Sequence, residues 1–215
     1  MVTLTRSPVF DYKALRLLVG IIALALPYVV IVFSTEKLAS ISASYYSEAR
    51  DYFIGMLFIV SAFLWAYNGH TVLQKTASKV ASLAACLVAL CPTSCNQCNG
   101  DASSAIHTIA AAVLFSILAY FCFGPFYQKV RNGSGKKKRR AVIYLLCGWA
   151  IVLAMLVALV AKIALTDVRV NELRVIYWVE LVALNAFGIG WITAGKYLPL
   201  LVDKEDALVL MGKRR

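Results

Sequence analysis

Charged residues are scarce in this sequence, and acidic residues are the scarcest of them. Charged residues make up 15% of the 215 residues, and only 11 Asp and Glu stand against 22 Lys and Arg. Hydrophobic residues make up 61%, with a mean hydropathy of +0.75, whereas soluble domains are about 45–50% apolar and about 25% charged. The composition therefore excludes an ordinary soluble domain and predicts a membrane protein.

Long apolar segments occupy most of the chain. A membrane-spanning helix needs about 20 mostly apolar residues, and a helix satisfies all of its own backbone groups, as lipid demands. The alternation typical of barrel strands is absent. We therefore expect an all-α bundle of six membrane helices, with residues 1–215 forming one membrane domain. The predicted spans are 15–33, 52–68, 79–92, 105–127, 141–165 and 174–194.

Basic residues are distributed unevenly between the two sides of these spans. If the chain starts in the cytoplasm, 17 of the 22 Lys and Arg lie on the cytoplasmic side. The positive-inside rule then predicts that both termini are cytoplasmic, in an inner (plasma) membrane. The same rule accounts for the net charge of +11 without a nucleic-acid partner, which we do not expect. The assignment depends on segment 79–92, which is short for a full crossing unless the polar stretch before it extends the helix.

One cytoplasmic loop carries a dense basic run. The run consists of Lys136, Lys137, Lys138, Arg139 and Arg140. It is a topology determinant, and each such residue near the surface also contributes about 1 kcal/mol to the attraction of anionic lipid. Membrane lipids, anionic lipid in particular, are therefore the expected partners.

The linker 34–51 on the opposite side is not random in sequence. Leu38, Ile41 and Tyr45 recur at helical spacing. This pattern favours a short helix that lies in the membrane interface, with an irregular loop as the alternative. Small residues at Ala186 and Gly190 predict close packing of the last span.

Three cysteines, Cys91, Cys95 and Cys98, form a C-x3-C-x2-C pattern on the outer side. The spacing matches an iron–sulfur motif of radical enzymes, but no α/β sequence surrounds it. A zinc site with His107 is a second alternative. In an oxidising compartment we expect one disulfide among the three cysteines.

Ionisable residues inside or beside the spans are the best candidates for a functional site, because they are costly at membrane depth. The candidate ligand-binding residues are Ser42, Arg50, Asp51, His107, Tyr177 and Glu180. We expect Asp51, His107 and Glu180 to lie at similar depth in the outer leaflet, either as a shared site or as a structural polar network. As metal ligands these three are weak candidates, since only one is a histidine. No catalytic residue is assigned, and no cofactor is expected.

Several short segments resemble a group of uncharacterised bacterial six-span inner-membrane proteins. Residues 40–46 and 50–55 resemble an SISxYY…RDxFxG signature, and segments 144–149 and 178–180 resemble the last two spans of that group. The resemblance covers about residues 38–196 and implies a fold of six spans but no function.

A more remote similarity is to DUF998-type and alkaline-ceramidase-like membrane hydrolases, which use Ser, Asp and His near one membrane face. Ser42, Asp51 and His107 resemble those positions, although the expected H-x3-H pair near the C-terminus is absent. The leading hypothesis is a membrane protein that binds a lipid head group or small solute at an outward-facing polar site. A metal-dependent lipid hydrolase and a non-catalytic scaffold or subunit are the alternatives, and whether the protein is an enzyme stays open.

Overall fold

The structure is a computed structural model that describes residues 12–93, 102–196 and 201. These residues form helices and no strands, as predicted. The elements are α1 (Tyr12–Phe33), η1 (Ser42–Tyr46), α2 (Arg50–Ala66), α3 (Val72–Leu90), α4 (Ala102–Phe121), η2 (Cys122–Phe126), α5 (Lys136–Ala164), α6 (Asp167–Glu172) and α7 (Val175–Gly195).

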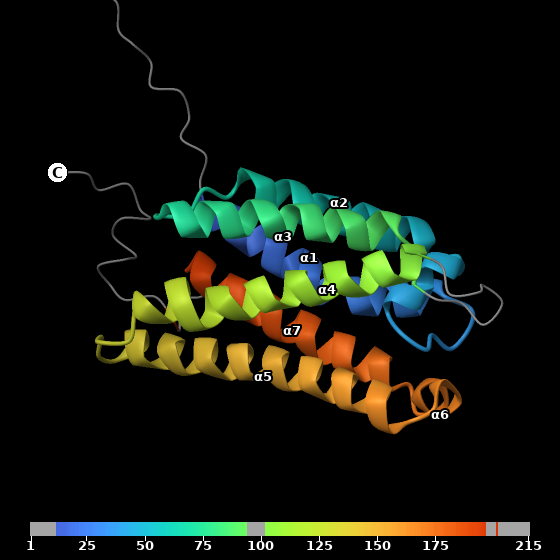
Figure 1. Cartoon of the computed structure of the whole chain (residues 1–215). Helices are drawn as coiled ribbons and strands as arrows, with labels where there is room; N and C mark the ends of the chain where they lie inside the picture. Colours follow the sequence, from blue (N-terminus) through green and yellow to red (C-terminus); the bar gives the residue numbers. More distant parts are fainter. Residues whose placement is uncertain (1–11, 94–101, 197–200, 202–215) are drawn as a thin grey trace, which may run out of the picture.

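The six long helices lie roughly along one direction (Figure 1), and their contacts with one another close into a ring. Each packs against the next long helix along the chain, and α7 closes the ring through its extensive contact with α1. One end of the bundle holds the start of α1 and the ends of α2, α4 and α7; we call it the basic end. The other holds η1 and α6; we call it the acidic end, because every acidic residue of the described ranges lies in that half.

The long helices coincide with the six predicted apolar segments. Five of them, all except α2, are long and apolar enough to cross a membrane. The third helix begins at Val72, earlier than predicted, and so reaches 19 residues. Thr71 explains this start, because its hydroxyl accepts a hydrogen bond from the Gln74 backbone N–H at 3.2 Å and caps the helix. The helix therefore includes the polar stretch that precedes its apolar residues.

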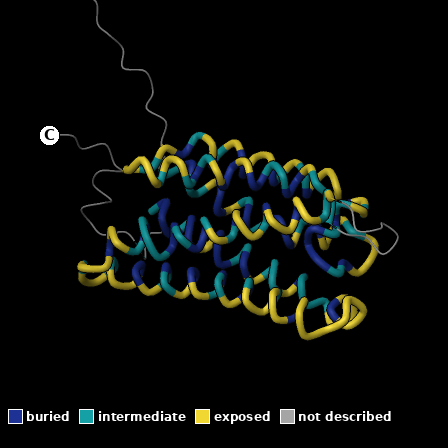
Figure 2. Tube along the Cα trace, viewed as in Figure 1, coloured by how far each residue is buried: buried dark blue, intermediate teal, exposed yellow. Residues whose placement is uncertain are grey.

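Exposed residues lie along the outer sides of the helices (Figure 2), and many of them are large hydrophobic residues. Large hydrophobic side chains are exposed along every long helix, and α5 carries the longest exposed face. Water would not tolerate so much apolar surface on a monomer. Trp65 near the basic end and Trp178 near the acidic end are also exposed, as is typical of the two aromatic belts at membrane interfaces. The surface therefore suits lipid.

The contact between α1 and α7 is made by glycine. A Cβ at Gly20 would lie 2.8 Å from the Gly188 carbonyl oxygen, and a Cβ at Gly188 would lie 2.8 Å from the Gly20 carbonyl oxygen. Only glycine at both positions allows the two backbones to approach this closely. The predicted small positions Ala186 and Gly190 are buried too, and Gly190 faces Cys122 and Cys147. Small residues in α7 thus allow close packing both against α1 and against η2 and α5.

A serine seam joins α2 to α3. The Ser61 hydroxyl donates to the Ser82 carbonyl oxygen at 2.8 Å, and the Ser82 hydroxyl donates to the Ser61 carbonyl oxygen at 2.8 Å. Ser78 donates to the Leu64 carbonyl oxygen at 2.6 Å. Polar groups in lipid are satisfied by such interhelical bonds, which explains why α3 tolerates its serines.

The linker between α1 and α2 contains the short helix η1, which spans only five residues. Leu38 and Ile41, which the helical spacing singled out, are buried against Leu26 and Val30 of α1. Their burial shows that the linker folds onto the helix bundle. A further short helix, α6, was not predicted.

Candidate functional site

Glu180 lies near the start of α7 and accepts three hydrogen bonds from the linker. The Ile41 backbone N–H, the Ser42 backbone N–H (3.2 Å) and the Ser42 hydroxyl (2.6 Å) all donate to its carboxylate. The first N–H groups of a helix have no partner within it, and a carboxylate is the group that satisfies them best. Glu180 therefore caps η1 from a distant helix. Ser42 is buried and engaged in the same contact.

Arg174, which immediately precedes α7, also binds the linker between α1 and α2. Its Nε donates to the Leu38 carbonyl oxygen at 2.7 Å, and its guanidinium lies 3.9 Å from the centre of the Tyr177 ring. The Tyr177 backbone N–H donates to the Ala39 carbonyl oxygen at 3.2 Å. Together with Glu180, these contacts hold residues 38–42 against the start of α7.

The backbone of Arg174 is in the left-handed region, with φ of 51° and ψ of 39°. For a residue other than glycine this conformation costs about 1–3 kcal/mol and persists only where the surroundings enforce it. Here it turns the chain from α6 into α7 and aims the guanidinium at the linker. Such strain is often found at binding sites.

The remaining candidates, Arg50, Asp51 and His107, make other contacts. The Arg50 guanidinium donates to the Tyr45 hydroxyl at 2.9 Å and lies over the Tyr45 ring at 4.4 Å. Asp51 is exposed in the first turn of α2, where an acidic side chain favours the helix. His107 is buried, and its Nδ1 lies 2.7 Å from the Cys91 carbonyl oxygen. Because a carbonyl only accepts, Nδ1 carries the proton and joins α4 to the end of α3.

The weak metal candidates Asp51, His107 and Glu180, and one cysteine of the predicted outer-side pattern, Cys91, lie among the described residues. Among the described residues, no group of three or more His, Cys, Asp or Glu could hold a metal ion, so Asp51, His107 and Glu180 do not form one. Cys91 has a free thiol, and no two cysteines of the described residues are at disulfide distance, so the structure does not show the predicted disulfide. Cys95 and Cys98 lie outside the described residues.

A polar pocket of about 230 Å³ lies beside the clamped linker, between the end of α1 and the start of α7. Its lining residues are Ile31, Ser34, Thr35, Glu36, Lys37, Leu38 and Arg174. The set combines two cations, one carboxylate, two hydroxyls and two apolar side chains. Within the described part of the chain, Nη1 and Nη2 of Arg174 donate to no residue, because only Nε is engaged with Leu38. The guanidinium therefore keeps its two terminal nitrogens for a ligand.

Glu48 holds Thr35, one of the residues that line this pocket. Its carboxylate accepts from the Thr35 hydroxyl at 3.1 Å and from the Thr35 backbone N–H at 3.4 Å. Its own backbone N–H, followed by these Thr35 bonds, lowers the pKa of the Glu48 carboxyl below the ordinary value of 4.5. The bond to Thr35 joins the start of the linker to its end.

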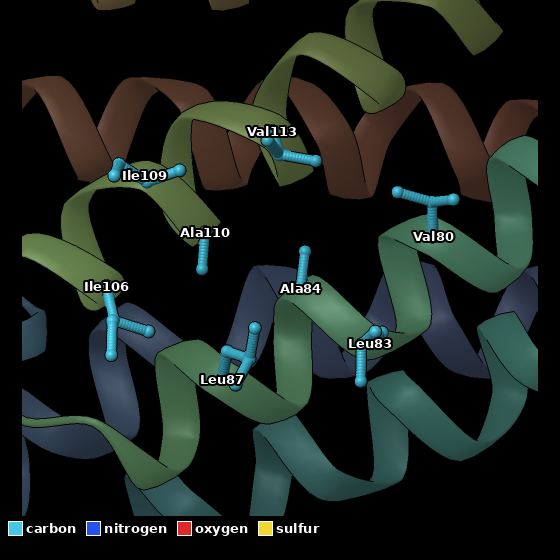
Figure 3. A pocket seen from close by; sticks show the side chains of 8 residues that line it. All are labelled: Val80, Leu83, Ala84, Leu87, Ile106, Ile109, Ala110 and Val113. Carbon is cyan, nitrogen blue, oxygen red and sulfur yellow. The ribbon is translucent and has the colours of Figure 1, made fainter. Parts of the chain in front are cut away.

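A second hollow, of about 220 Å³, lies between α3 and α4 and is wholly apolar. Figure 3 shows Ala84 of α3 and Ala110 of α4 facing each other across it, with larger aliphatic side chains around them. Without a polar side chain it cannot orient a head group. Its lining suits a hydrocarbon chain of the surrounding lipid.

Sequence reasoning identified Glu180, Ser42 and Tyr177 as candidate residues of a functional site, and all three lie at the contact between the linker and the start of α7. It missed the pocket, because seven elements of the chain lie between Lys37 and Arg174. Comparisons with protein-family models, curated proteins and solved structures find no match for this chain.

Proposed function

We propose that this protein is a six-span membrane protein that binds a phosphate-bearing head group in the polar pocket at its acidic end. The pocket carries the proposal, because it sets the free nitrogens of Arg174 and the ammonium of Lys37 beside hydroxyls and apolar side chains. Guanidinium groups bind phosphate through paired, charge-assisted hydrogen bonds. The reaction is binding alone, with no bond made or broken.

Two observations support the six spans. The helix α2 has 17 residues, which at about 1.5 Å per residue is roughly 26 Å, close to the hydrocarbon thickness. It also belongs to the same ring as the five longer helices. The basic end would face the cytoplasm of a cell whose inner membrane holds the protein, as the positive-inside rule favours.

The pocket composition favours a phospholipid over a free anion. Ile31 and Leu38 add apolar walls where the head group of a lipid would meet its acyl chains. Glu36 supplies a carboxylate that suits the ammonium of an amine-bearing head group. An inorganic anion would use Arg174 and Lys37 alone. The proposal therefore expects a zwitterionic phospholipid such as phosphatidylethanolamine to bind best.

The test compares lipid binding by the full chain and by two variants in neutral detergent. Native mass spectrometry with phosphatidylethanolamine, phosphatidylglycerol and inorganic phosphate measures the bound fraction. We expect Lys37→Gln and Arg174→Lys each to weaken phosphatidylethanolamine binding by roughly tenfold, the effect of losing about 1.4 kcal/mol of charge-assisted bonding. Arg169→Gln is the matched control, because Arg169 is an exposed arginine of α6 that pairs with Glu172.

Equal loss in the Arg169→Gln control would refute a specific site, as would unchanged binding by the Lys37→Gln variant. Binding of inorganic phosphate as tight as that of the lipid would refute the lipid head group as the ligand. The variant Arg174→Lys also needs a stability measurement, because Arg174 holds Leu38. If it unfolds, Lys37→Gln decides alone.

The basic run offers a separate contact with anionic lipid at the opposite end. Lys138 and Arg139 are exposed there and suit this role. Arg140, by contrast, is only 1% exposed, so the predicted lipid contact of this residue is not supported by its position. We therefore propose the contact with anionic lipid for the first four residues of the run, Lys136 to Arg139.

A further inference from the structure

A polar pair lies on the outer side of the contact between α1 and α7. The Tyr28 hydroxyl donates to Oδ1 of Asn185 at 3.2 Å, and the Tyr28 side chain is 52% exposed. Polar side chains within membrane spans are costly, so most of them face the interior of the bundle or bond a neighbouring helix. The bond from Tyr28 satisfies the oxygen of the Asn185 amide in this way.

The nitrogen of the same amide is only partly satisfied. Nδ2 of Asn185 donates to the Leu181 carbonyl oxygen at 2.7 Å, one turn back along α7. A side-chain amide has two N–H groups, and within the described part of the chain the second one donates to no residue. An N–H that meets only hydrocarbon is unfavourable. The position therefore favours a ligand that brings an acceptor.

The polar pair lies next to the polar pocket, on the side toward the middle of the membrane. Ile31 lines the pocket, and Tyr28 precedes it by three residues, which is about 4.5 Å along α1. On α7, the Arg174 guanidinium lies over the Tyr177 ring. The carbonyl oxygen that holds the amide belongs to Leu181, four residues or about 6 Å further along the helix. Both helices thus place the amide about one turn deeper than the pocket.

This arrangement matches the build of a glycerophospholipid. The phosphate of such a lipid is joined through the glycerol carbons to acyl esters, whose carbonyl oxygens are acceptors on the side of the hydrocarbon chains. With the phosphate at Arg174, an ester carbonyl comes to lie beside the Asn185 amide. Val182 and Ile189 are exposed on the same face of α7, and they offer apolar surface to the acyl chain that follows the ester.

We infer that Asn185 recognises an acyl ester of the lipid whose head group occupies the polar pocket, so that the ligand is a diacyl glycerophospholipid. Its second N–H donates to the ester carbonyl oxygen. Tyr28 is a positioning residue, because its hydroxyl fixes the orientation of the amide through Oδ1. This role of Asn185 rests on the proposed function, and it names the class of lipid that the pocket takes.

Native mass spectrometry of the full chain in neutral detergent tests this role with two probes. They are phosphatidylethanolamine and its dialkyl ether analogue, which has the same head group and chain length but no ester carbonyl. We expect the wild type to bind the diacyl lipid about three- to tenfold more tightly, the effect of one hydrogen bond. Asn185→Leu should bind the two lipids equally.

Thr108→Val is the matched control for the loss of a polar group from a span. Thr108 is exposed on α4, and its hydroxyl donates to the Ser104 carbonyl oxygen of the same helix at 2.9 Å. The control should keep the full preference for the diacyl lipid. Loss of the preference in Thr108→Val as well would show that the effect is not specific to Asn185 and would overturn its role.

Lys37→Gln separates the role of Asn185 from the proposed function. It should weaken the binding of both lipids by the same factor, because both carry the same head group. A wild type that binds both lipids equally, or an Asn185→Leu variant that keeps the preference, would overturn the role of Asn185 and leave the polar pocket standing. Unchanged binding by Lys37→Gln, with the ester preference intact, would instead overturn the polar pocket as the anchor of the head group.

Tyr28→Phe is the second variant, and it decides if Asn185→Leu does not fold. It keeps the amide and removes only the hydroxyl that orients it. The preference for the diacyl lipid should fall to less than about half of the wild-type ratio. A full wild-type ratio in Tyr28→Phe would then overturn the role of the pair.

Discussion

The glycine contact between α1 and α7 gives the sharpest prediction about stability. We consider Gly20→Ala, which adds a single methyl group. That Cβ would lie 2.8 Å from the Gly188 carbonyl oxygen and 2.6 Å from the Ile192 side chain. Ordinary contact begins at 3.4 Å, so the two helices must separate by about 0.6 Å at their closest point. The Ile192 side chain can adjust, but the Gly188 carbonyl oxygen and the Ile192 backbone nitrogen, which is also 2.8 Å away, cannot move without moving α7.

The expected cost follows from this geometry. Overpacking of a tight contact costs about 1–3 kcal/mol, and alanine recovers up to about 1 kcal/mol through its higher helix propensity. Gly55→Ala isolates the second effect, because a Cβ at Gly55 meets nothing within 4 Å. The difference between the two variants is therefore about 1–3 kcal/mol. For a chain of this size that corresponds to a melting temperature about 2–12 °C lower for Gly20→Ala than for Gly55→Ala.

The assay is thermal unfolding of the purified chain in one detergent, followed by size-exclusion chromatography after heating. Gly188→Ala should cost a similar amount, because its Cβ meets the Gly20 carbonyl oxygen at 2.8 Å. The double variant should cost less than the two single costs together, since one separation of the helices relieves both contacts. Equal melting temperatures for Gly20→Ala and Gly55→Ala would refute the close approach of the two backbones.

Three further predictions concern the linker and the serine seam. Glu180→Gln replaces the charged acceptor of the linker N–H groups with a neutral amide and should destabilise the chain by about 1–3 kcal/mol, whereas the exposed Asp51→Asn should change the melting temperature little; a silent Glu180→Gln would contradict the capping role. Ser82→Ala should cost about 0.5–1.5 kcal/mol by thermal unfolding, and an unchanged melting temperature would argue against the bond to Ser61. The bond from Thr35 to Glu48 is favoured above pH 4.5, the ordinary pKa, and is lost as the pH falls through the lowered pKa. Proteolysis of the linker should therefore rise below about pH 4.5 in the wild type but be pH-independent in Glu48→Gln, and a wild-type rate that is flat with pH would refute the link.

Composition and charge by themselves determined the all-α class and the positions of the long helices. Lipid leaves few alternatives to a helix for an apolar run, because every backbone group must be satisfied locally. The predicted segments coincide with the six long helices, and the largest differences are at the starts of α3 and α5, which begin seven and five residues earlier than predicted. The serines of α3 made this segment look too polar to span a membrane. The structure shows that Ser82 of α3 and Ser61 of α2 bond each other, which satisfies these polar groups.

The site depended on the tertiary structure, because its contacts join residues that are far apart in the sequence. Burial at membrane depth made Glu180 a candidate, but no local pattern identifies the N–H groups of Ile41 and Ser42 as its donors. Likewise, the buried position of Arg140 cannot be distinguished from that of exposed Arg139 within the same basic run. Hydropathy and charge are properties of consecutive residues, so they indicate where each helix lies in the sequence and which ends are basic. Which side chains meet is decided by the closure of the ring, where Gly20 and Gly188 bring α7 against α1.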